Sequence, residues 1–134
     1  MESSASLHVI EEYVSSGNFF EARRQLQVGE SRRPDPFAEP LKVLDAEVRL
    51  ELGSLYAARR LAEEISRTPT ANRSHLARAH RVLARCCFHT GEMDKSRTHL
   101  ASARQLCEGA RDSVGLARVE LTRFALFSGV EPLQ

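Results

Sequence analysis

The sequence predicts an all-α protein, built as a stacked array of antiparallel helical hairpins with about seven helices. Three observations lead to this prediction. Apolar residues recur at helical spacing along the chain, glycine-containing turns return at nearly constant intervals, and no segment shows the alternation or the Asn-Gly and Asp-Gly turns of β-hairpins.

The first two helices are expected at residues 5–16 and 19–29, on either side of a tight turn. Gly17 lies between them, where a residue without a Cβ most easily adopts the left-handed conformation that ends a helix. Asn18 and Glu21 have the spacing of a capping box, which predicts the start of the second helix.

The third and fourth helices are expected at residues 37–52 and 55–67. Asp35 followed by Pro36 predicts the beginning of the third helix, because an N-cap aspartate and a first-turn proline are both typical there. In each helix the apolar residues fall on one face, namely Leu41, Leu44, Val48 and Leu52, and then Leu55, Ala58, Ala62 and Ile65.

The last three helices are expected at residues 74–89, 93–108 and 113–128. Pro69 lies in the turn that precedes them, where a proline interrupts no helix. The sixth helix shows the same periodicity as the earlier ones, with a face formed by Met93, Ser96, Leu100 and Ala103.

A repeat is visible in the positions of the turn glycines. Gly17, Gly53, Gly91 and Gly129 are separated by 36, 38 and 38 residues, and each follows an amphipathic segment. A period in the thirties with one glycine turn per unit is typical of stacked helical hairpins. The units are expected near residues 3–36, 39–72, 77–110 and 115–134, the last of them truncated.

These units resemble tetratricopeptide repeats (TPR), which have a large apolar residue two positions after the glycine and a small residue three positions further. No tryptophan opens any unit, so the resemblance is to a divergent form of the family. It implies a right-handed α-solenoid whose concave face is lined by the first helix of each unit. The residues that carry the resemblance are Tyr13, Gly17, Phe19, Ala22 and Leu26, then Gly53, Leu55, Ala58 and Ala62, then Gly91, Met93, Ser96, Leu100 and Ala103.

Composition limits the range of functions. The 134 residues (15.0 kDa) suit one domain, and a net charge of +1 argues against a protein that mainly coats nucleic acid or an anionic membrane. Phosphate-binding glycine loops, Gly-x-Ser-x-Gly and His-Glu-x-x-His are all absent from the sequence. We therefore expect no enzyme activity and no cofactor.

Metal binding is not expected either. Cys86 and Cys87 are adjacent, and neighbouring side chains on a helix diverge by about 100°, so the two thiols cannot chelate one ion together. An odd number of cysteines and the lack of a basic, then apolar, leader favour a reduced cytoplasmic protein. The two lysines against 17 arginines point to a bacterial source.

The resemblance to the family also indicates which side chains face the concave groove. Charge is segregated among these positions, with acidic residues in the first two units and basic residues in the third and fourth. The candidates for binding a partner are Glu47, Leu50, Arg78, Arg81, Arg85, Phe88, Arg123 and Phe127.

Two interpretations of the arginine stripe remain open. Arg78, Arg81 and Arg85 have i, i+3, i+7 spacing and so share one helix face. They either bind carboxylates or a phosphate of a ligand, or they form a solvated face with ion pairs to Glu47 and Glu51.

The resulting functional prediction is a non-catalytic module that binds a protein or peptide with acidic and apolar residues in its groove. By resemblance, it would be a sensing or docking domain in a larger bacterial regulator, with this chain as the N-terminal part. The alternatives are self-association through the apolar C-terminal end and nucleic-acid binding through the arginine face, the latter disfavoured by the net charge.

Overall fold

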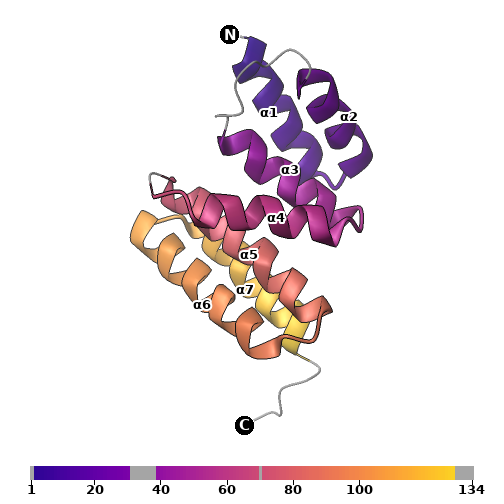
Figure 1. The fold of residues 1–134 in the computed structure, drawn as a ribbon. Helices are drawn as coiled ribbons and strands as arrows, with labels where there is room; N and C mark the ends of the chain where they lie inside the picture. The colour runs from indigo at the N-terminus through magenta and orange to yellow at the C-terminus, as the bar shows by residue number, and fades with distance from the viewer. Residues whose placement is uncertain (1, 31–38, 70, 129–134) are drawn as a thin grey trace.

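The computed structural model describes residues 2–30, 39–69 and 71–128, and side chains within residues 7–27, 39–69 and 71–128. These ranges contain seven α-helices and no strand, so the predicted all-α class is confirmed. The helices follow one another from one end of the molecule to the other (Figure 1). They are α1 (Glu2–Ser15), α2 (Phe19–Glu30), α3 (Glu39–Glu51), α4 (Leu55–Ser66), α5 (Arg73–His89), α6 (Met93–Ala110) and α7 (Ser113–Phe127).

The helix boundaries agree with the sequence prediction to within three residues, with α1 starting earlier and α6 ending later than expected. α6 continues through Gly109 because its terminating left-handed residue is Arg111, with φ of 55°. The expected cap at Asp35 and Pro36, and the fourth turn glycine, lie outside the described residues.

Three helices end in the same way, at the turn glycines. Gly17, Gly53 and Gly91 have φ values of 81°, 88° and 82°. After α5, the amide of Gly91 donates to the carbonyl of Phe88 at 3.1 Å and the amide of Glu92 to that of Cys87 at 2.8 Å. The same pair of bonds occurs at the other two turns, so each helix ends in a Schellman motif that satisfies its last carbonyls.

We expect Gly91→Ala to lower the free energy of unfolding by about 1–2 kcal/mol. An added Cβ would meet nothing within 4 Å, so the cost would come from the left-handed backbone alone. Urea unfolding measures this change in the free energy of unfolding. Gly109→Ala is the control, because Gly109 is helical and its Cβ would meet only the flexible end of Arg73; a loss at Gly109 equal to that at Gly91 would contradict this explanation.

The position five residues after each of these glycines is fully buried. Ala22, Ala58 and Ser96 are each 0% exposed, so α2, α4 and α6 each approach their neighbours closely one turn after they begin. Ser96 satisfies its hydroxyl by donating to the carbonyl of Ala84 at 2.7 Å. A serine is therefore accommodated at this position without leaving a buried polar group unpaired.

The core consists of three clusters, and each cluster joins three consecutive helices. The first lies among α1, α2 and α3, the second among α3, α4 and α5, and the third among α5, α6 and α7. α3 and α5 each belong to two clusters, so they are buried on two faces. Their apolar residues therefore cover more of the helix surface than the single stripe of an ordinary amphipathic helix.

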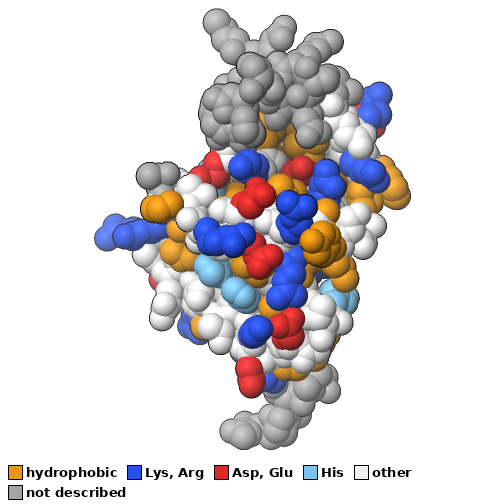
Figure 2. Space-filling view, viewed as in Figure 1, with side chains coloured by type: hydrophobic (Ala, Val, Ile, Leu, Met, Phe, Trp, Pro, Cys, Tyr) orange, Lys and Arg blue, Asp and Glu red, His pale blue; other side chains and the backbone are white. Residues whose placement is uncertain are grey.

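Contacts between helices follow a regular pattern. Each helix packs against the next along the chain, and α1, α3, α5 and α7 also contact one another in succession. On the face seen in Figure 2, basic and acidic side chains intermingle rather than forming a patch of one sign. Among the described residues, no helix is both long enough and apolar enough to cross a membrane.

A histidine pair joins α5 to α6. The Nδ1 atoms of His80 and His99 lie 2.9 Å apart, so one nitrogen donates and the other accepts. Burial lowers the pKa of both imidazoles below the usual value; the neighbouring His99 adds to the effect at His80, and Arg59 adds to it at His99. The folded protein therefore favours the neutral pair.

We expect this pair to make folding less stable in mild acid. The unfolded state takes up protons below about pH 6.5, where the folded pair still resists them, so the free energy of unfolding falls as the pH drops from 7.5 to 5. Urea unfolding at several pH values measures this. A His80→Gln/His99→Gln variant keeps the other three histidines and should show a flatter dependence; parallel curves for the two proteins would contradict the assignment.

Candidate functional site

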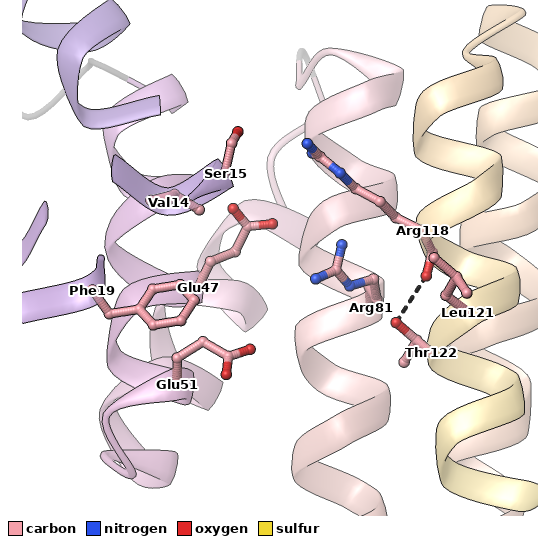
Figure 3. Close-up of a pocket in the computed structure, with 9 residues that line it drawn as sticks. All are labelled: Val14, Ser15, Phe19, Glu47, Glu51, Arg81, Arg118, Leu121 and Thr122. Carbon is pink, nitrogen blue, oxygen red and sulfur yellow. Dashed lines mark hydrogen bonds between the residues drawn. The ribbon is translucent and has the colours of Figure 1, made fainter. Parts of the chain in front are cut away.

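An open groove lies between the N-terminal and C-terminal halves of the helix array. Its cavity has a volume of about 230 Å³. Side chains from α1, α3, α5 and α7, together with Phe19 at the start of α2, line this groove (Figure 3). The lining residues are Val14, Ser15, Phe19, Glu47, Glu51, Arg81, Arg118, Leu121 and Thr122.

Arg78 of the predicted stripe is held in an ion-pair network beside the groove. Its Nε donates to Glu47 at 3.0 Å, its Nη2 donates to Glu11 at 2.9 Å, and Nη2 also contacts the other Glu47 oxygen. Burial lowers the pKa of this guanidinium, but the hydrogen bonds and charges of both glutamates outweigh burial and raise it overall. Arg78 therefore joins α5 to α3 and α1 through its Nε and Nη2 atoms.

Arg85 is occupied in a similar way. Its Nη1 pairs with Glu51 of α3, and both side chains are about three-quarters buried. Arg123, on α7, pairs with Glu120 of its own helix at 3.3 Å and is half exposed. Within the stripe, Arg78 and Arg85 thus match the interpretation of a face paired with Glu47 and Glu51.

Arg81 and Arg118 differ from the other arginines around the groove. Within the described part of the chain, neither guanidinium makes a hydrogen bond or an ion pair, although both side chains are half-buried; the backbone carbonyl of Arg118 accepts from the Thr122 hydroxyl at 2.9 Å. Burial lowers the pKa of Arg81; Arg85, Arg118 and Arg78 act in the same direction, and Glu47 opposes them. Figure 3 shows both side chains extending from α5 and α7 toward the gap that separates them from α3.

Several residues predicted to face the groove lie in the core instead. Leu50 is 6% exposed within the α3–α4–α5 cluster, and Phe127 is 2% exposed within the last cluster. Phe88 packs edge-on against Phe127, with ring centroids 5.5 Å apart. Leu50 and Phe127 therefore hold helices together and present no surface to a groove ligand, whereas Phe88 is partly buried and packs against the last cluster.

Of the groove residues, only Glu47 and Arg81 are among the candidates predicted from the sequence; Phe19, Arg118, Leu121 and Thr122 are among those that were missed. On α7 the core side is fixed by Val119 and Phe127, which are both buried. Arg118, Leu121 and Thr122 are related by i, i+3 and i+4 spacing and form the adjoining face. That spacing was visible in the sequence, but only the structure shows which α7 face is buried.

The cysteines do not form a reactive or metal-binding site. Cys86, Cys87 and Cys107 are all buried and free, and burial raises the pKa of each thiol. The residues that the structure describes contain no group of three or more His, Cys, Asp or Glu side chains able to hold a metal ion. The groove lining combines apolar side chains with charged side chains of both signs.

Comparison of this chain with protein-family models, with curated proteins and with solved structures found no match in any of the three.

Proposed function

We propose that this chain is a non-catalytic interaction module, a right-handed TPR-like array that binds a segment of a partner protein in its groove. The observation that carries the proposal is the groove itself, which four successive odd-numbered helices line and in which the guanidinium groups of Arg81 and Arg118 make no hydrogen bond or ion pair with the described residues. In a larger bacterial regulator, such a module would serve as a docking or sensing domain in the cytoplasm.

Repetition in the structure supports the array. The three glycine caps, the buried small residues and the three-helix core clusters recur along the chain in the same order. Arrays of this kind place the first helix of each unit on one surface, where an extended ligand can contact several units. The succession of contacts from α1 to α7 is what such an arrangement requires.

The size of the groove favours a peptide over a small molecule. Pockets for drug-sized ligands usually enclose roughly 300–1,000 Å³, whereas this cavity holds about 230 Å³ and is open to solvent. One or two side chains of an extended segment would occupy it, while the rest of the segment continues along the helices. A protein ligand is also favoured over nucleic acid, because carboxylates already engage Arg78 and Arg85.

Selection of random peptides displayed on phage against the purified chain tests the proposal. We expect enriched peptides whose binding is lost in Thr122→Trp, since this substitution fills the groove. Thr98→Trp is the matched control: Thr98 makes the same hydroxyl bond to the carbonyl four residues earlier, but it is exposed on α6. Failure to enrich any peptide, or equal binding by both variants, would contradict the proposed function.

A further inference from the structure

The groove contains an imbalance between paired and unpaired charges. Glu47 and Glu51 line its α3 side and are engaged by Arg78 and Arg85. Arg81 and Arg118 line the opposite side, and their guanidinium groups have no hydrogen-bond or ion-pair partner in the described chain. A guanidinium that is partly buried without a hydrogen bond or ion pair is unfavourable, so these two side chains can gain from an anion supplied by another molecule.

Resting on the proposed function, we infer that Arg81 and Arg118 together bind one carboxylate side chain, an aspartate or glutamate of the partner segment. Guanidinium groups form their strongest hydrogen bonds with carboxylates and phosphates, and their planar donors fit two oxygens at once. Because the two arginines come from α5 and α7, such a carboxylate would also link adjacent units of the array.

The opposite wall favours a carboxylate over a phosphate. The side chains of Glu47 and Glu51 extend toward the same gap from α3 (Figure 3). A phosphoryl group carries nearly two negative charges at neutral pH, and it would be repelled more strongly by these glutamates than a singly charged carboxylate would be. The groove therefore selects against the more highly charged ligand.

Apolar surface beside the arginines defines the rest of the ligand. Leu121 is 69% exposed although it lines the groove, and Val14 and Phe19 lie across from it. A large apolar residue of the ligand would cover these side chains while its acidic neighbour reaches Arg81 and Arg118. The expected recognition element is thus an acidic residue next to a leucine, phenylalanine or similar residue.

The test uses the peptides that the phage selection yields and measures their affinity by fluorescence anisotropy. We expect the pool to be enriched in Asp or Glu beside an apolar residue. Arg81→Gln and Arg118→Gln should each weaken binding by about ten- to hundredfold without lowering the thermal midpoint. Arg60→Gln is the matched control, since Arg60 is exposed on α4 and remote from the lining; it should bind as the parent does.

Two results would overturn the inference and leave the proposed function standing. One is a set of peptides whose binding is lost in Thr122→Trp, but which are not enriched in acidic residues. These peptides would also bind the arginine variants as tightly as they bind the parent chain. The other is tighter binding when phosphoserine replaces the acidic residue, which would assign the pair to phosphate. Absence of any groove-dependent peptide would instead count against the proposed function itself.

Discussion

Replacing Arg78 by methionine is expected to lower the free energy of unfolding by about 3–5 kcal/mol. The side chain of its partner Glu47 is only 8% exposed, so removing the guanidinium leaves a buried carboxylate without its cation. Methionine preserves most of the volume, so the loss would come from the unpaired charge rather than from a cavity. Urea denaturation followed by circular dichroism measures this change.

A double substitution separates the cost of leaving the Glu47 carboxylate unpaired from the contribution of the ion pair itself. Arg78→Met/Glu47→Leu removes both charges, and most of the stability should return, because an apolar pair can replace a buried ion pair at little cost. Arg49→Met is the matched control, since its pair with Asp45 at 2.8 Å is substantially exposed and is worth less than about 1 kcal/mol. A loss below about 1 kcal/mol for Arg78→Met would show that Glu47 is hydrated.

Truncation of Phe127 to alanine is expected to lower the free energy of unfolding by about 3–5 kcal/mol. The ring is 2% exposed, packs edge-on against Phe88, and lies 4.5 Å from the Arg97 guanidinium. Its removal would leave a cavity where α5, α6 and α7 meet, although Phe127 is the last residue of its helix. Chemical denaturation of the variant quantifies the loss.

Phe124→Ala is the control for Phe127. Phe124 lies one turn earlier on the same helix and is 68% exposed, so its truncation should change stability by no more than about 0.5 kcal/mol. Equal effects of the two substitutions would mean that α7 does not pack as described. The exposed apolar side chains of α7 thus include Leu121 and Phe124 but not Phe127.

The helices could be predicted from the sequence because their signals are local. Glycines that end helices, prolines between helices and apolar residues at helical spacing report on the backbone within a few residues of themselves. The end of α6 was the exception. A left-handed arginine, Arg111, ends that helix, and no intrinsic preference of arginine predicts this conformation.

The candidate site was predicted only in part because it depends on which face of each helix is buried. Glu47 and Arg81 were assigned to the groove and do line it. Leu50 was assigned there as well, but α3 packs against helices on two sides and buries it. Arg118 was missed, because its lack of a partner follows from the placement of α7 relative to α3 and α5. Such relations between distant helices leave no spacing signal in the sequence.

Binding of a partner segment in the groove between the odd-numbered helices is central to the proposed function. It is tested most directly by intermolecular nuclear Overhauser effects between a selected peptide and the methyl-labelled chain. We predict effects to the methyl groups of Val14 and Leu121, which line the groove from opposite ends of the helix array. Effects confined to the methyl groups of Leu106, which lies in a separate hollow on α6, would contradict the claim.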